Sequence, residues 1–187
     1  MADSDRRATI LAQATSLFRR LGFAKTSLAD VARSAGVSRP TLYSEFSSKT
    51  ALFDEVIRSL VVETITQIES GMPSEGPLSE RLLYACRTWV HSGHVLVVEN
   101  PDAADLFDPA LDAVKASNRS FEVLLCSLLP DRPTAAVAEI SSERMSEMIS
   151  LSLQGFKRFA ETPQHLDELI EALVETACLA YSDDDLG

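Results

Sequence analysis

A four-residue turn, Ala35-Gly36-Val37-Ser38, constrains the fold of this chain more than any other feature. It stands between two short segments, residues 28–35 and 38–46, whose apolar residues recur at helical spacing. The glycine supplies the backbone conformation that ends the first helix, and the valine is an apolar plug that packs the turn. The serine offers an N-cap to the second helix. Two short helices joined in this way predict a helix-turn-helix unit.

A third helix precedes this unit, and a long helix follows it. Apolar residues from Ile10 to Leu21 fall on one helical face, and Gly22 stands where a C-terminal cap belongs. Ser27, with Asp30 three residues later, comes close to a capping box for the next helix. After these short helices, the helical period continues for about six turns, which predicts a helix over about 48–70.

Residues that begin or end helices recur along the rest of the chain. The stretch GMPSEGP at 71–77 contains two glycines and two prolines and predicts a loop. Thr162-Pro163 places proline at the first helical position after an N-cap. Beyond the loop we expect helices over about 78–99, 109–129, 134–160 and 162–181, with a short element around 103–107. No run alternates with period two, so the expected fold is all-α, with a three-helix head at 1–50 and a helical-bundle body at 51–187.

The net charge of −11 hides an asymmetry between these two parts. Residues 1–58 contain nine Lys and Arg against six Asp and Glu, whereas the remainder contains eight against 22. A basic head on an acidic body can face nucleic-acid phosphate while the body stays away from it.

Signals for other locations and chemistries are weak. No apolar stretch reaches about 18 residues and no signal-peptide pattern occurs, so we expect no membrane span and a cytoplasmic location. Cys86, Cys126 and Cys178 are far apart, which predicts free thiols rather than disulfides or a zinc ribbon. His91 and His94 form an HxxH pair that lacks the metalloprotease signature, and no nucleophile motif stands out. We therefore expect no metal, no cofactor and no catalysis.

The start of the second motif helix carries side chains suited to DNA. In such units the N-terminal residues of this helix point into the major groove. Ser38 and Thr41 can bond a phosphate or a base edge, and Arg39 can reach a guanine or a phosphate. Pro40 is tolerated in the first helical turn and can present an apolar face to a thymine methyl.

Neighbouring residues extend this predicted interface. Tyr43 lies one helical turn from Pro40, on a face that can meet the DNA backbone. Lys49 and the free N–H groups at the start of the long helix form an anion site. Leu42 and Phe46, spaced by four, are expected to point inward and to hold the helix in place. Arg6 and Arg7 are either a loose arm near the DNA or a solubilising start.

The segment TSLADVARSAGVSRPTLYSEFSSKTAL, from Thr26 to Leu52, resembles the DNA-binding signature of the TetR family of bacterial transcriptional regulators. The matched elements are the Thr-Ser start of the second helix, the Ala-Gly-Val-Ser turn, Thr-Leu-Tyr, and the Phe and Ser-Lys that lead into the fourth helix. The resemblance implies a homodimer whose heads bind a palindromic operator in double-stranded DNA, through Thr26, Ser27, Ser38, Arg39, Pro40, Thr41, Tyr43 and Lys49. It also implies a body that binds an unknown small-molecule effector and dimerises through the last two long helices.

Two positions depart from the pattern of the family. Arg39-Pro40 stands where members often carry a small residue, such as glycine, at the second position. Glu45 is acidic where many members carry a residue compatible with DNA. A carboxylate close to phosphate weakens binding unless it turns away or pairs with a base, for which Arg19 and Arg33 are candidates.

The body offers candidates for a ligand pocket and for a dimer interface. Aromatic and methionine side chains at helical spacing are typical of a core, and they also suit a cavity in a bundle, which makes the pocket candidates Trp89, Phe107, Phe121, Leu125 and Met148. The apolar faces of the last two helices predict an interface that contains Met145, Ile149, Phe156, Leu166, Leu169, Ile170, Leu173 and Ala177. The alternative is that both helices only close the core of a monomer.

These features predict a ligand-responsive, sequence-specific DNA-binding regulator, which we expect to be a repressor that a small molecule releases from its operator. Two other classes stay open at this point. One is a ligand-independent architectural DNA-binding protein, and the other is an enzyme that has kept a helix-turn-helix appendage.

Overall fold

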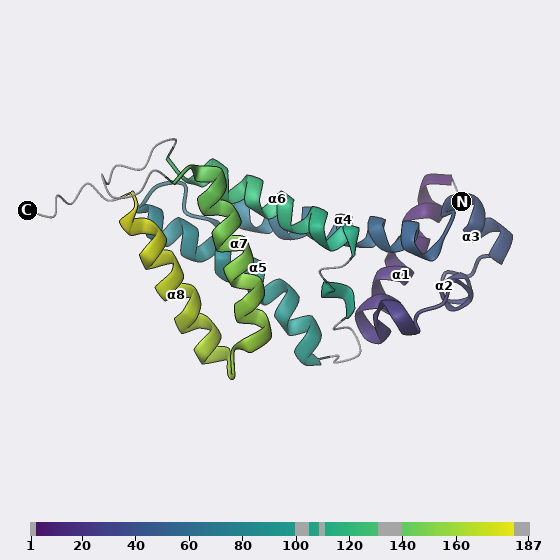
Figure 1. Cartoon of the computed structure of the whole chain (residues 1–187). Coiled ribbons are helices and arrows are strands. Elements are labelled where there is room, and N and C mark those ends of the chain that lie inside the picture. The colour runs from purple at the N-terminus through teal and green to yellow at the C-terminus, as the bar shows by residue number, and fades with distance from the viewer. Residues whose placement is uncertain (1–2, 100–104, 109–110, 131–139, 182–187) are drawn as a thin grey trace, which may run out of the picture. The chain divides into compact units, whose positions relative to one another are not determined.

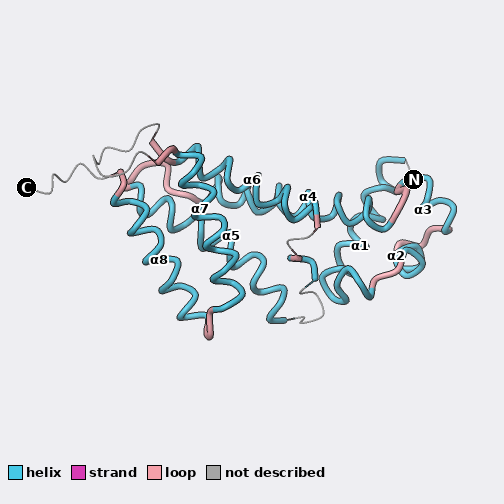
Figure 2. The backbone as a smooth tube through the Cα atoms, viewed as in Figure 1, coloured by secondary structure: helices cyan, strands magenta, loops and turns pink. Residues whose placement is uncertain are grey.

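The fold is all-α, as predicted. A computed structural model describes residues 3–99, 105–108, 111–130 and 140–181, and these residues form helices without any strand (Figures 1 and 2). The helices are α1 (Asp3–Lys25), α2 (Leu28–Ser34), α3 (Arg39–Glu45), α4 (Lys49–Gly71), α5 (Leu78–Glu99), α6 (Asp112–Leu128), α7 (Ser142–Phe159) and α8 (Pro163–Leu179). A single 3₁₀ turn occupies residues 105–107, within the range expected for a short element.

Side-chain caps set the starts of four helices. Ser27, Ser38 and Thr162 each accept a backbone N–H of the first helical turn, which confirms the three predicted caps. Such caps stabilise a helix by about 1 kcal/mol each. Ser141 caps α7 in the same way, so this helix begins at 142 rather than near 134. Of the residues 134–141 that we expected to be helical, 134–139 lie outside the described residues, and Ile140 and Ser141 are not helical.

Gly22 breaks α1 close to its end. Its φ of 75° and ψ of 175° lie in a region of backbone space that is essentially restricted to glycine. The helical face that begins at Ile10 therefore ends where the sequence predicted. The last residues of α1 leave in a new direction toward the start of α2.

The chain divides into two compact units, whose boundaries fall within α4, α5 and α6. The N-terminal unit comprises Met1–Val62 and Gly93–Ser117, and the C-terminal unit comprises Glu63–Ser92 and Asn118–Gly187. The functional division at residues 50 and 51 stays a prediction.

The N-terminal unit has a core of aliphatic and phenylalanine side chains from α1 to α4 and the 3₁₀ turn. Its buried members are Ile10, Ala14, Leu17, Phe18, Val31, Ala32, Leu42, Phe46, Leu52, Phe53, Val56, Ile57 and Leu106. The rings of Phe18 and Phe53 meet edge to face, with their centroids 5.4 Å apart. Because this core contains side chains of α1, α2, α3 and α4, it fixes the orientation of α3 relative to α1 and α4.

The C-terminal unit joins α5, α6, α7 and α8 through a second set of buried side chains. Trp89 of α5 stacks on Phe121 of α6, with ring centroids 4.4 Å apart and planes nearly parallel. Such a contact adds about 0.5–1.5 kcal/mol to the burial of the rings. At the edge of α5, Arg87 pairs with Glu171 and Asp167 of α8. None of the described helices is long and apolar enough to cross a membrane.

Candidate nucleic-acid interface

The turn between α2 and α3 has the geometry that the sequence predicts. Gly36 adopts a φ of 66°, a left-handed conformation that costs other residues about 1–2 kcal/mol. The N–H of Val37 donates to the Ala32 carbonyl at 3.0 Å, and the Val37 side chain packs against the core. The chain thus leaves α2 and enters α3 within a few residues, as a helix-turn-helix requires.

One face of α3 is anchored in the N-terminal unit. Leu42 is fully buried and Phe46 is nearly so, which confirms that both side chains point inward. At the start of the helix, the Ser38 hydroxyl accepts the Thr41 N–H at 3.2 Å and lies 2.7 Å from the Thr41 hydroxyl. These contacts hold α3 rigidly, although it has only seven residues.

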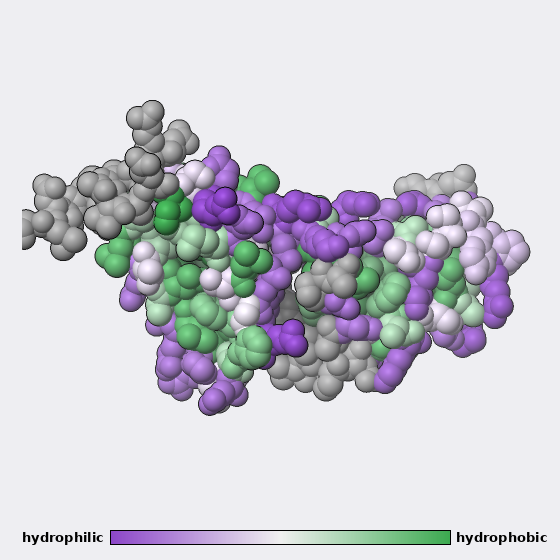
Figure 3. Space-filling model, in the orientation of Figure 1, coloured by the Kyte–Doolittle hydropathy of each residue, from purple (hydrophilic) through white to green (hydrophobic). Residues whose placement is uncertain are grey.

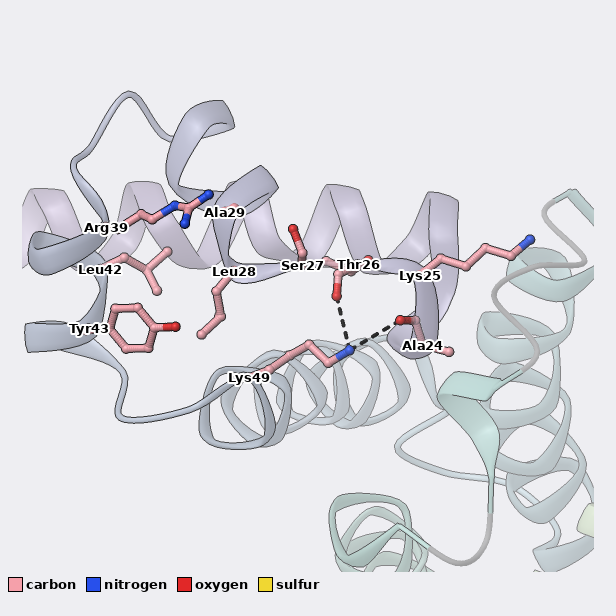
Figure 4. A pocket seen from close by; sticks show the side chains of 10 residues that line it. All are labelled: Ala24, Lys25, Thr26, Ser27, Leu28, Ala29, Arg39, Leu42, Tyr43 and Lys49. Carbon is pink, nitrogen blue, oxygen red and sulfur yellow. Dashed lines mark hydrogen bonds between the residues drawn. The ribbon is translucent and has the colours of Figure 1, made fainter.

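The opposite face of α3 lies open. Arg39 and Pro40 are exposed, and Tyr43 exposes 54% of its surface. A hollow of about 440 Å³ lies beside Arg39 and Tyr43, and it is also lined by Ser27 at the start of α2 and Lys49 at the start of α4 (Figure 4). The fold therefore gathers side chains from three helices that the sequence assigned to DNA.

Lys49 is held by the protein's own backbone. Its ammonium donates to the carbonyls of Thr26 at 3.1 Å and Ala24 at 3.4 Å (Figure 4). It also donates to the carbonyl of Phe23 at 2.8 Å and lies 4.3 Å from the centre of the Phe23 ring. Thr26 is buried, and its hydroxyl donates to the Gly22 carbonyl. Both side chains fasten the link between α1 and α2. The DNA contacts expected of Thr26 and Lys49 stay predictions. Such contacts would compete with the hydrogen bonds that these side chains make to the backbone.

Asp105 holds the same link by a contact that no local pattern indicated. Its two carboxylate oxygens accept the N–H groups of Phe23 and Ala24, each at 2.7 Å. Hydrogen bonds to a charged acceptor are stronger than neutral ones. The partners lie 82 and 81 residues apart in the chain, so only the folded structure reveals them.

Glu45 is neutralised, but not by the expected partners. Its carboxylate pairs with Arg6 and Arg7 from the first turns of α1. The candidate Arg33 instead pairs with Asp30 on its own helix, at 3.0 Å. Glu45 therefore pairs with a base, as one of the two alternatives required, but the bases are Arg6 and Arg7 rather than the candidates Arg19 and Arg33. Arg6 and Arg7 are neither a loose arm nor a merely solubilising start.

Comparison with known proteins identifies this head. Residues 10–56 match the sequence model described as "Bacterial regulatory proteins, tetR family". The N-terminal part of the chain is a DNA-binding domain of the TetR family. This match assigns the head to a family of helix-turn-helix transcriptional regulators.

Curated relatives of this TetR-family chain match its N-terminal part. The HTH-type transcriptional regulator EthR of Mycolicibacterium smegmatis is 45% identical over 67 residues, which cover 36% of this chain and 29% of that protein. The uncharacterized HTH-type transcriptional regulator YhgD of Bacillus subtilis is 33% identical over 78 residues, 42% of this chain and 41% of that protein. The chain therefore spans less than half the length of these relatives.

Solved structures extend the likeness to the whole fold. A tetR-family transcriptional regulator from Streptomyces coelicolor superimposes with a TM-score of 0.69 at 22% identity, covering 96% of this chain and 82% of that chain. At this identity the likeness concerns the fold alone. The TetR-like arrangement of a helix-turn-helix head and a helical body is thereby shown.

The candidate pocket residues of the TetR-family body are not all brought together. Trp89, Phe121 and Leu125 lie in the C-terminal unit, where Leu125 is fully buried. Phe107 packs against the core of the N-terminal unit, and Met148 is 47% exposed on α7. Trp89 and Phe121 are brought into direct contact, and a ligand pocket around them stays a prediction.

The candidate interface residues fall into two groups. Met145, Ile149, Leu166, Ile170 and Ala177 are buried within the chain itself, whereas Phe156, Leu169 and Leu173 are half-buried. A second copy can touch only what one copy exposes. Any interface on α7 and α8 must therefore use side chains that stay at least partly exposed, which among the candidates are Phe156, Leu169 and Leu173.

His91 has a partner of its own. Its Nε2 lies 2.9 Å from Asp167 Oδ1, on α8. The side chain of His94 lies outside the described residues. Within the described part of the chain, no three His, Cys, Asp or Glu side chains gather in a way that could hold a metal ion.

Proposed function

We propose that this TetR-family chain binds a palindromic operator as a homodimer and acts as a repressor that a small molecule releases. The observation that carries the proposal is the division of α3 into two faces. Leu42 fixes one face in the core, while Arg39 and Tyr43 stand exposed on the other. A rigid short helix with exposed arginine and tyrosine is suited to base and phosphate contacts in a major groove.

Homodimerisation is supported by exposed apolar side chains of the C-terminal unit. Met148, Leu151 and Phe159 of α7 and Leu179 of α8 are 47%, 59%, 75% and 70% exposed. Apolar residues gather over α7 and α8 in the face shown in Figure 3. Large exposed apolar patches mark interaction sites. Two copies joined at this surface would present two α3 helices, which must lie about 34–36 Å apart to enter successive major grooves.

The effector is proposed to bind in the C-terminal unit. The stacked Trp89 and Phe121 and the buried Leu125 supply an apolar, aromatic lining of the kind that holds small molecules. A ligand can release the operator only through the difference between its affinities for the two states, typically about 1–3 kcal/mol.

DNA selection from a random or genomic fragment pool, read at two salt concentrations, tests the proposal. A palindromic consensus with binding that falls steeply with salt is the expected result, because several phosphate contacts release counterions. Binding without a consensus contradicts the proposed operator and favours an architectural DNA-binding protein. Repeating the selection after refolding from denaturant excludes the case in which an inducer has been purified with the protein.

A further inference from the structure

Glu45 occupies an unusual place for a carboxylate. It is the last residue of α3, two positions beyond the exposed Tyr43. Next to phosphate, a carboxylate there would repel the ligand that this helix is proposed to bind. The structure instead turns Glu45 away, and its side chain is only 15% exposed.

Two arginines from the start of α1 form hydrogen bonds with Glu45. Arg6 donates from Nε and Nη2 to Glu45 Oε1, both at 3.1 Å. Arg7 donates from Nη1 to the backbone carbonyl of Glu45 at 2.8 Å, and the same nitrogen lies 3.8 Å from Glu45 Oε2. Side chain and backbone of one residue therefore hold both guanidinium groups.

Further contacts fix Arg7. Its Nη2 donates to Glu55 Oε2 of α4 at 2.7 Å, and its guanidinium carbon lies 4.3 Å from the centre of the Phe46 ring. Arg58 of α4 lies 3.8 Å from the same Glu55 oxygen, so the cluster contains three arginines and two glutamates. It joins the first turns of α1 to the end of α3 and to α4 (Figure 1).

The chemistry of DNA binding gives this cluster a purpose. Arginine contacts with phosphate are independent of sequence and supply essentially all of non-specific affinity. Without their contacts to Glu45, Arg6 and Arg7 could bind phosphate beside α3, the helix that is proposed to read bases. Loss of the Glu45 carboxylate would remove one negative charge from the cluster, together with the oxygen that accepts both the Nε and the Nη2 N–H groups of Arg6.

We propose that Glu45 is a specificity-determining residue, which positions Arg6 and Arg7 against the end of α3 and so keeps both guanidinium groups off phosphate. The inference rests on the proposed DNA-binding function. Glu45 acts through the arginines and makes no contact with DNA itself. It lowers affinity for arbitrary sequence and thereby raises the ratio of specific to non-specific binding.

The test measures how the binding of a non-operator DNA fragment depends on salt, for the full chain and for Glu45→Ala. Each arginine that gains a phosphate steepens the slope of log affinity against log salt by about 0.9. The variant is expected to steepen it by about 0.9 for each protomer, from Arg6, because Arg7 keeps Glu55 and the backbone carbonyl of residue 45. Its affinity for arbitrary sequence should rise several-fold at low salt. Asp54→Ala is the matched control, because it removes one carboxylate of α4 for which the described residues show no ion pair.

A second variant, Arg6→Gln, tests the proposed role of Glu45 even if Glu45→Ala does not fold. If Glu45 keeps Arg6 off phosphate, this variant has the salt slope of the unmodified protein. A slope that flattens by about 0.9 shows that Arg6 already binds phosphate and overturns the proposal. So does an unchanged slope in folded Glu45→Ala, or an equal steepening in Asp54→Ala. An unmodified protein that binds no DNA at any salt overturns the proposed function itself, which is a different result.

Discussion

Arg39 and Tyr43 are the side chains of α3 that stand free to meet DNA. We expect Arg39→Ala to cost about 1–3 kcal/mol of operator binding if the guanidinium contacts a guanine, and Tyr43→Phe to cost less because it removes one hydroxyl. Neither change touches the core, so thermal unfolding should be unaffected. Titration of operator DNA at fixed salt measures the effect.

The control for this prediction is Arg20→Ala, which removes an exposed arginine from α1 instead of α3. Equal losses for Arg20→Ala and Arg39→Ala would show a general effect of charge. Unchanged affinity in both α3 variants would contradict the assignment of α3 as the reading helix.

Lys157 provides a prediction about pH. It lies half-buried on α7, and burial lowers the pKa of its ammonium to about 8, against about 10.4 in an unfolded chain. Below pH 8 both states carry the proton, and the folded state bears the full cost of burying the charge. Between about 8 and 10.4 the unfolded state binds more protons, so this residue's contribution to stability improves as pH rises.

Lys157→Met should therefore raise the free energy of unfolding by about 1–3 kcal/mol at pH 7. This difference in stability between the variant and the unmodified protein should narrow as the pH approaches about 10. Urea unfolding of both proteins at pH 7, 8.5 and 10 measures it. A gap that is the same at all three values would contradict the lowered pKa.

Individual residues also differ in whether their roles can be predicted from the sequence. Arg39 and Tyr43 were predicted because their roles follow from position in a short motif. The partners of Glu45 were not, since Arg6 lies 39 residues away in the chain and no local pattern encodes that ion pair. The three carbonyls that receive Lys49 escaped prediction for the same reason, because backbone acceptors have no signature in a sequence.

At the scale of elements, the turn between α2 and α3 depends on Gly36. Gly36→Ala meets no steric obstacle within 4 Å, but it must adopt a φ of 66°. We expect a loss of about 1–2 kcal/mol in stability, measured by urea unfolding, from the left-handed backbone alone.

Gly155→Ala is the matched control for the turn. This glycine lies inside α7, likewise has no atom within 4 Å of an added Cβ, and does not have a left-handed φ. Alanine there should stabilise the helix by about 0.5–1 kcal/mol. Opposite signs for the two substitutions separate backbone strain from helix propensity, and a stabilising Gly36→Ala would contradict the account of the turn.

Element boundaries were predictable where a side chain sets them. Ser27, Ser38 and Thr162 cap their helices as expected, because a cap requires only residues within one turn of each other. The start of α7 was misjudged, because the apolar period is weak there and Ser141 was not recognised as the cap.

At the scale of the whole molecule, the exposed apolar side chains of α7 predict association. Leu151→Arg places a charge at a position that is 59% exposed, so one copy should fold normally while the proposed homodimer dissociates. Sedimentation velocity should show monomers, and affinity for a palindromic operator should fall toward that of a half-site.

Val62→Arg, a change at a 60% exposed valine of α4, controls for added charge and should leave the dimer intact. Dimers that persist in Leu151→Arg would exclude this face of α7 from the interface.

The interface was harder to predict than the fold. Helical periodicity shows that α7 and α8 are apolar over a broad face, but it does not distinguish side chains buried by the chain itself from those left for a second copy. Ile149 and Ile170 fit the pattern and are fully buried, whereas Leu151, which lies outside the predicted set, is 59% exposed.

The burial of Leu106 in the N-terminal unit has a consequence for how the protein is made. A ribosome delivers the chain from its N-terminus, and domains generally fold as units when their residues have emerged. The helices α1, α2 and α3 emerge long before Leu106 completes their core and before Asp105 reaches the N–H groups of Phe23 and Ala24. The head that is synthesised first is therefore expected to become compact only after α5 has left the ribosome.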